Sequence, residues 1–148
     1  MIRNWISKKF NELTVDELYQ ILQLRSEVFV VEQNCPYLDC DDKDQKSQHF
    51  WTCDNEKIIS YVRILPPGVS YEEMSIGRVC TSPSVRRSGA GKELMEAAIN
   101  ECYRLHGQGP IRIGAQLYLK KFYESFDFIS DGNVYLEDDI EHTIMLKA

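Results

Sequence analysis

The sequence predicts an α+β fold, built as a single domain over residues 1–148, with helices on both faces of a mixed, twisted sheet of six to seven strands. Two observations lead to this prediction. Apolar or alternating runs typical of strands are interleaved with helical spacings, in the order β-α-β-β-β-α-β-α-β-β. A basic, glycine-rich loop also joins one strand directly to the longest helix, within residues 76–106.

The N-terminal elements follow from spacing and capping. Residues 2–10 alternate enough to predict a first strand. Thr14 and Glu17 form a capping-box pattern, which starts a helix. The buried face of that helix recurs at spacings of three and four, and it comprises Leu18, Ile21, Leu22, the stem of Arg25, Val28 and Phe29. Residues 30–33 are too apolar for an exposed loop, so we expect them to be covered.

A polar connection, residues 34–48, comes next. Its four aspartates lack the glycine of an EF-hand loop, and Lys43 stands where a calcium ligand belongs. Cys35, Cys40 and His49 do not have the spacing of a zinc site. We therefore expect a solvated loop over a ligand cleft and no metal.

The middle of the chain is rich in strands. Residues 49–53 and 57–65 predict an antiparallel hairpin. A central strand at 76–81 ends before Pro83, which has no N–H for a ladder. The long helix then runs to about residue 106, and its predicted buried stripe is Gly91, Met95, Ala98, Cys102 and Leu105.

The C-terminal part predicts one more helix between strands. Residues 111–115 form a buried-strand run, and residues 118–126 place apolar side chains on one face of a short helix. Strands at about 129–136 and 142–147 flank an acidic turn.

Composition excludes several classes of function. The net charge of −6 argues against nucleic acid and mildly favours a cationic partner such as an amine. No apolar run approaches the roughly 20 residues of a membrane helix, and the first residues lack a signal-peptide core. Five scattered cysteines do not suggest a disulfide framework, so a cytoplasmic location is expected. The oligomeric state stays open, with a homodimer as one expectation.

The loop of residues 86–91 predicts an anion site, because it opens a helix whose first N–H groups are unpaired. It is not a Walker loop, since Glu93 stands where Ser or Thr is required, and Leu94 replaces the last glycine of the dinucleotide fingerprint. What remains, R-x-x-G-x-G, resembles the pyrophosphate-binding motif of the GCN5-related N-acetyltransferase (GNAT) superfamily. An ordinary turn with solvated arginines is the alternative.

Two further stretches strengthen the resemblance. Residues 115–128 are similar to the late segment A-Q … F-Y-E-x-x-G-F of that superfamily, with Asp127 in place of the glycine. Residues 24–37 resemble the segment L-R-x-x-V-F-V-V-E-Q-N-C-P-Y of the bacterial ElaA-like acetyltransferases. The similarity covers residues 4–146. It implies the acetyltransferase fold, acetyl-CoA as co-substrate and an amine as acceptor, without saying which amine.

The resemblance also implies which residues hold acetyl-CoA. The glycine-rich loop binds the pyrophosphate, and the strand before it supplies fixed N–H donors for the developing oxyanion. Gln116 either bonds the pantetheine amides or is a satisfied polar group at a strand end. The expected cofactor-binding residues are Val79, Cys80, Thr81, Arg86, Arg87, Ser88, Gly89, Ala90, Gly91, Lys92 and Gln116.

Two residues are expected to be catalytic. Tyr123 matches the family tyrosine that protonates the departing thiolate, and a phenol with a pKa of roughly 10 is protonated at pH 7; core packing is the alternative. Glu32 is expected to be the base, because partial burial would raise its pKa. An ion pair with Arg25 or Arg63 is the alternative for Glu32.

Other mechanisms and functions stay open at this point. His142 has an intrinsic pKa suited to a base, a water chain could serve instead, and Cys80 could accept the acyl group as a nucleophile. A non-catalytic acyl-CoA-binding regulator is the alternative function. A metal-binding module on residues 35–44 is poorly supported by spacing.

Overall fold

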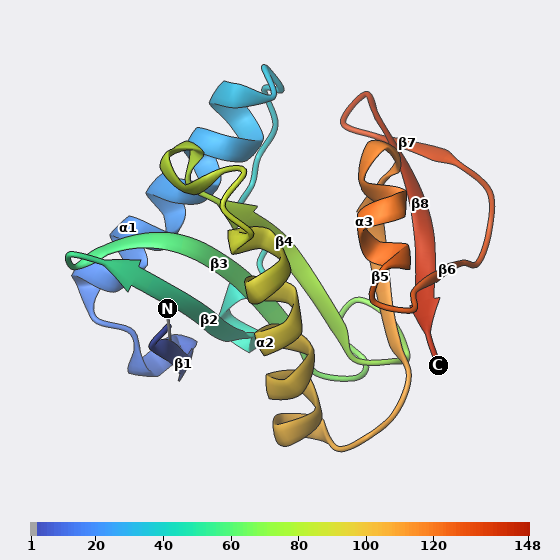
Figure 1. Cartoon of the computed structure of the whole chain (residues 1–148), viewed down its shortest axis with the longest axis horizontal. Coiled ribbons are helices and arrows are strands. Elements are labelled where there is room, and N and C mark those ends of the chain that lie inside the picture. The colour runs from blue at the N-terminus through green and yellow to red at the C-terminus, as the bar shows by residue number, and fades with distance from the viewer. Residues whose placement is uncertain (1–2) are drawn as a thin grey trace.

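The computed structural model describes residues 3–148, and it arranges eight strands in two sheets (Figure 1). The first sheet is antiparallel, in the order β1 (Trp5–Lys9), β2 (Gln48–Asp54), β3 (Lys57–Leu65) and β4 (Ser75–Thr81). In the second sheet β8 (Ile140–Lys147) pairs with β5 (Ile111–Gln116), β6 (Ile129–Ser130) and β7 (Tyr135–Glu137). The α+β class is confirmed.

The two sheets meet at one end and then separate. A parallel bridge joins Met74 to Ile111, and the Arg112 backbone N–H donates to the Met74 carbonyl at 3.1 Å. Beyond this contact β4 and β5 diverge along their length (Figure 1). Each strand therefore turns one backbone edge toward the space between the sheets, which is where the candidate site lies.

Helices cover both faces of the first sheet, as expected. Alternate residues of a strand point to opposite faces. Val62 and Ile64 pack into one cluster with residues of α2 (Ala90–His106), whereas Tyr61 packs into the other cluster with residues of α1 (Val15–Arg25). Both clusters bury their members almost completely, so β3 lies at the centre of the core.

The capping box that starts α1 is confirmed. Thr14 Oγ1 accepts from the Glu17 N–H at 3.0 Å, and Glu17 Oε1 accepts from the Thr14 N–H at 2.9 Å. After Arg25 the chain continues as a π-helix, Ser26–Glu32. The expectation that residues 30–33 are covered is wrong in part: Val31 is 72% exposed, because the π-helix carries it on its outer side.

The remaining elements agree with expectation except near the C-terminus. The first strand and the hairpin are confirmed, although residue 2 lies outside the described residues. The helix expected at 118–126 is shorter, a 3₁₀ turn followed by α3 (Lys120–Glu124). The strand expected at 129–136 is split into β6 and β7, with Gly132 at φ +138° between them. Over residues 3–148, no helix is long and apolar enough to cross a membrane.

Candidate active site

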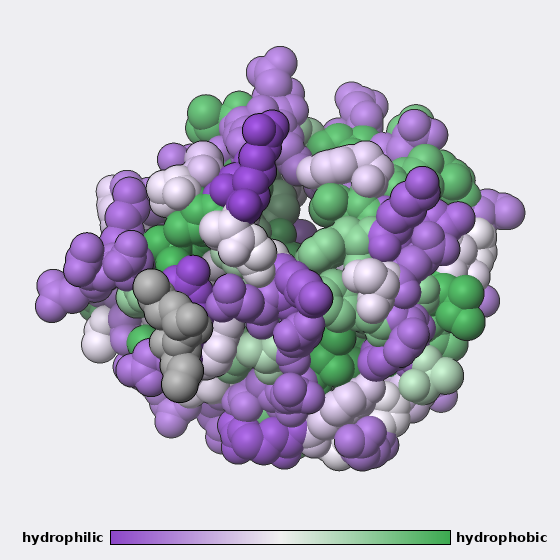
Figure 2. Space-filling model, viewed as in Figure 1, coloured by the Kyte–Doolittle hydropathy of each residue, from purple (hydrophilic) through white to green (hydrophobic). Residues whose placement is uncertain are grey.

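A pocket of about 740 Å³ lies where the two sheets diverge. Gly77 to Thr81 of β4 line one wall, and residues of β5, the 3₁₀ turn and α3 line the other. The π-helix and the loop after it contribute to its rim. Figure 2 shows the surface hollowed here, with hydrophobic residues in and around the hollow. The pocket is thus bounded by elements from both halves of the chain.

The β4 wall carries a β-bulge. Tyr61 pairs with Cys80 and Arg63 pairs with Gly77, so Val62 faces two residues, Arg78 and Val79. Arg78 has φ +51°, a left-handed conformation that costs a non-glycine residue roughly 1–2 kcal/mol. A bulge bends its strand and redirects the backbone, as is common beside active sites. Val79, Cys80 and Thr81, which follow the bulge, line the pocket as a result.

The N-terminus of α2 lies beside the pocket. Gly89 is its N-cap at φ +84°, and it supplies no side chain to cap the helix. Within residues 3–148, the backbone N–H groups of residues 89–92 have no protein acceptor. Four free N–H groups together with the positive end of the helix dipole suit an anion such as a phosphate.

The structure brings eight of the expected site residues to one pocket. Those that line it are Glu32, Val79, Cys80, Thr81, Arg86, Gly91, Gln116 and Tyr123. The others lie just outside the pocket, at the loop: Arg87, Ser88, Gly89 and Lys92 are exposed, and Ala90 is buried under the loop. Pocket and loop are therefore continuous through Arg86 and Gly91.

Tyr123 combines packing with access to the pocket. Its ring makes edge contacts with Phe122 and Phe128, with centroids 5.2 and 6.1 Å away. Burial raises the pKa of its phenol, which therefore stays protonated at neutral pH. Its hydroxyl makes no hydrogen bond to residues 3–148, so its proton is not committed to the protein. The role as proton donor stays a prediction, and the geometry is compatible with it.

Gln116 ends β5 and forms a reciprocal amide pair with Gln33. Each side-chain amide donates to the oxygen of the other, at 3.0 and 3.1 Å. The pair links the end of the π-helix to the second sheet at the pocket. Gln33 has no signal in the sequence beyond its place in the Glu-Gln-Asn-Cys-Pro run, since a partner 83 residues away cannot be inferred from local spacing.

The reason for expecting Glu32 to act as a base is wrong. Its carboxylate accepts two hydrogen bonds from Arg86, at 2.6 and 2.7 Å. These hydrogen bonds hold the pKa of Glu32 below its usual value, whereas the sequence predicts a pKa raised by partial burial. Arg86 is also neither of the two arginines that the sequence suggests as partners. Glu32 as base stays an untested prediction without support from its surroundings.

His142, on β8, has the better geometry for a base. Its Nδ1 contacts the Ile140 carbonyl at 2.7 Å, so Nδ1 carries the proton and Nε2 is the nitrogen with the free lone pair. The ring lines the pocket, and Nε2 lies 3.6 Å from a Glu137 carboxylate oxygen. Its ring also stacks on Tyr135.

Cys80 does not have the surroundings of a nucleophile. It is 4% exposed, and burial raises the pKa of its thiol to about 12. A thiol needs to be a thiolate to attack a thioester. The acyl-enzyme mechanism through Cys80 therefore has no support here.

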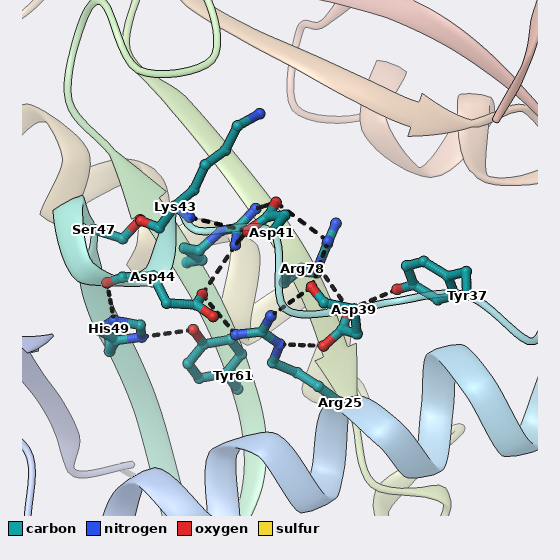
Figure 3. A network of polar contacts seen from close by, with 11 residues as sticks. Arg25, Tyr37, Asp39, Asp41, Lys43, Asp44, Ser47, His49, Tyr61 and Arg78 are labelled. Atoms are coloured by element: carbon teal, nitrogen blue, oxygen red, sulfur yellow. Dashed lines mark hydrogen bonds and ion pairs between the residues drawn. The ribbon is translucent and has the colours of Figure 1, made fainter. Parts of the chain in front are cut away.

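The loop expected to be solvated is instead fixed by arginines (Figure 3). Asp39 and Asp44 are buried, and Asp41 is half-buried. Arg25 binds Asp39 and Asp44 at 2.7 and 2.8 Å, and Arg63 binds Asp41 and Asp44. The expectation is wrong because these aspartates pair with arginines that are distant in the sequence. Among residues 3–148, no group of three or more metal-ligating side chains could hold a metal.

Sequence reasoning also missed a constriction in the pocket. A Cβ at Gly114 would lie 3.0 Å from both the Tyr71 and the Tyr135 hydroxyl oxygens. Gly114 and Tyr71 line the pocket. A lone glycine inside a strand is a known signal for close approach of another group, and it could have identified this position.

Comparison with known proteins agrees with this arrangement. The family model of the acetyltransferase (GNAT) domain matches residues 12–148. Protein ElaA of Escherichia coli is 40% identical over 145 residues, which cover 97% of this chain and 95% of that protein. Its crystal structure superposes with a TM-score of 0.92, over 99% of this chain and 100% of that one, at 38% identity.

A second solved structure is equally similar. The crystal structure of an acyl-CoA N-acyltransferase from Pseudomonas aeruginosa has a TM-score of 0.94 and 39% identity, over 99% of this chain and 100% of that one. The resemblance inferred from three short motifs is therefore confirmed over nearly the whole chain. The chain belongs to the GNAT acetyltransferase family, and within it to the ElaA-like proteins.

Proposed function

We propose that this chain transfers the acetyl group of acetyl-CoA to a primary amine by direct attack. The observation that carries the proposal is the continuity between the free N–H groups at the start of α2 and a pocket that contains Tyr123 and His142. Family membership supports acyl transfer from an acyl-CoA in general. That the acyl group is acetyl and that the acceptor is an amine are parts of the proposal that go beyond family membership.

The residues present fit coenzyme A. Gly89 to Lys92 offer backbone N–H donors for a pyrophosphate, and space is open where a Cβ at Gly89 would lie. The free edge of β4 offers main-chain groups with which an extended pantetheine amide chain can pair like an added strand. Acetyl-CoA supplies an activated thioester and a thiolate leaving group. No metal is required by this chemistry.

Different residues of the chain then supply the three catalytic functions. We assign to the backbone of Val79 to Thr81, which line the pocket, the donation of a hydrogen bond to the thioester carbonyl oxygen, where negative charge develops. Tyr123 holds a proton on its phenol oxygen for the leaving sulfur. His142 Nε2 is the position at which the proton of the incoming ammonium is accepted, directly or through one water molecule.

The acceptor end of the pocket supports a cationic substrate. Glu137 and Asp138 line it, and among residues 3–148 neither is paired with Lys or Arg. Attraction between these carboxylates and an ammonium group also agrees with the net charge of −6. A non-catalytic acyl-CoA-binding regulator would not need proton donors and acceptors on this wall.

The experiment is an acetyl-CoA-dependent thiol-release assay with polyamines, amino sugars and peptides with a free N-terminus. We expect at least one amine to accelerate thiol release by more than tenfold over acetyl-CoA alone, and mass spectrometry to find it acetylated. Tight binding of acetyl-CoA with no acceleration by any amine class would favour the regulator. A cytoplasmic location and a homodimer stay predictions, for which fractionation and light scattering are the measurements.

A further inference from the structure

The bulge in β4 is connected to a buried charge network. Arg78, the left-handed residue of the bulge, extends its side chain toward the loop of residues 37–41 (Figure 3). Its Nε lies 2.8 Å from Asp39 Oδ1, and its Nη2 donates to the Asp39 carbonyl at 2.9 Å. Its guanidinium also lies over the Tyr37 ring, 5.9 Å from the centroid.

Asp39 contacts several members of this network at once. Its other carboxylate oxygen accepts from Arg25 Nε at 2.7 Å, and Tyr37 donates its hydroxyl proton to Oδ1 at 2.6 Å. Asp39 is 8% exposed and Arg25 is 0% exposed. An ion pair that is buried and held by several hydrogen bonds keeps a defined geometry, unlike an exposed pair. The loop therefore ties the bulge to helix α1, on the far side of the sheet from α2.

We propose that Asp39 and Arg78 are positioning residues for acyl transfer: Asp39 holds the Arg78 side chain, and this keeps the left-handed turn that directs the Val79–Cys80 backbone into the pocket. The proposal rests on the proposed function, because it assigns these residues to the polarisation of an acyl-CoA carbonyl. Neither side chain is placed in contact with reacting atoms.

The bulge needs support from its surroundings. An arginine at φ +51° is unfavourable unless the surrounding structure enforces it, and the contacts on Asp39, Asp41 and Tyr37 do so. Glycine adopts the same conformation without cost. Arg78→Gly and Arg78→Ala remove the same contacts, and they differ only in whether the backbone still tolerates the bulge.

The experiment compares these two variants with the wild-type chain, using acetyl-CoA labelled with ¹³C at the carbonyl. Calorimetry measures its affinity, and the infrared carbonyl stretch of the bound molecule measures the polarisation of its thioester. We expect both variants to bind within about threefold of the wild type, because the α2 loop is unchanged. The stretch should shift to lower wavenumber in wild type and Arg78→Gly, and it should return toward the value in water in Arg78→Ala.

Equal shifts in all three proteins, or equal loss in both variants, would overturn the positioning role. Failure of the wild type to bind acetyl-CoA would instead overturn the proposed function, so the two failures are distinguishable. Asp39→Asn extends the test: it should behave like Arg78→Ala, and the double variant Asp39→Asn/Arg78→Gly should recover the shift. If Asp39→Asn does not fold, the comparison of Arg78→Gly with Arg78→Ala still tests the proposal.

Discussion

The carboxylate of Glu32 and the guanidinium of Arg86 form two parallel contacts, 2.6 and 2.7 Å long, between the π-helix and the loop before α2. Both side chains are partly exposed, at 38 and 39%. Because Arg86 lowers the pKa of Glu32 and occupies both of its oxygens, Glu32 is ionised but poorly able to accept a proton. The Glu32–Arg86 pair is more readily understood as part of the pocket rim than as acid–base machinery.

We therefore expect Glu32→Gln to lower kcat by less than about threefold, whereas His142→Gln lowers it by a factor on the order of 10² or more, the usual contribution of a general base. Steady-state kinetics of both variants provide the measurement, with any amine that the thiol-release assay finds. The reverse pattern would restore Glu32 as the base.

The aspartate network makes the free energy of unfolding depend on pH. Burial raises the pKa of Asp44, but the hydrogen bonds and charges of Arg25 and Arg63 outweigh this and lower it overall. Below about pH 4 the unfolded chain therefore binds more protons than the folded chain. The contribution of ionised Asp44 to the free energy of unfolding is complete at higher pH, and it is lost as the pH falls through the pKa of Asp44 in the folded chain. We expect Asp44→Asn to destabilise by about 3–5 kcal/mol at pH 7, because it leaves two buried arginines short of a partner.

Asp42→Asn is the matched control, since Asp42 is exposed, has no ion-pair partner within residues 3–148, and has a left-handed φ that asparagine tolerates. Its effect should stay within about 0.5 kcal/mol. Urea unfolding at pH 7 and pH 3 measures both variants. The deficit of Asp44→Asn should shrink at the lower pH, and a deficit independent of pH would contradict the electrostatic explanation.

The sequence could predict features whose signals are local. Thr14 and Glu17 lie three residues apart, so the start of α1 could be inferred from their order alone. The loop of residues 86–91 could be recognised because its glycines and arginines are contiguous. The order of elements followed from periodicity in the same way.

Contacts between distant residues could not be predicted. Arg25 and Asp39 are 14 residues apart, and Arg78 and Asp39 are 39 apart, so their pairing depends on how the elements pack in three dimensions and not on local spacing. The bulge at Arg78 has no local signal, because arginine rarely adopts a positive φ and nothing in the sequence around it resembles a turn. For the same reason the sequence predicts a solvated loop where the aspartates are in fact buried against arginines.

Tyr123→Phe tests the proton donor, because it deletes one hydroxyl and keeps the ring in its contacts with Phe122 and Phe128. We expect kcat to fall by a factor on the order of 10² while the affinity for acetyl-CoA barely changes. Tyr118→Phe is the control, since Tyr118 also lines the pocket but is 72% exposed. Steady-state kinetics on one well-accepted amine measure both variants. A fully active Tyr123→Phe enzyme would rule out Tyr123 as the proton donor.

The central claim is that the backbone at the start of α2 binds coenzyme A, and Gly89→Val compared with Gly107→Val tests it most directly. Both glycines have positive φ, +84° and +86°, with no atom within 4 Å of the place where a Cβ would lie, and they cap opposite ends of the same helix. Valine should therefore destabilise either end, by at least about 1–2 kcal/mol, but it covers free N–H groups only at residue 89. Calorimetric titration with acetyl-CoA should show no binding by Gly89→Val and near wild-type affinity for Gly107→Val, provided that thermal unfolding finds both folded. Unchanged affinity in Gly89→Val would contradict the account.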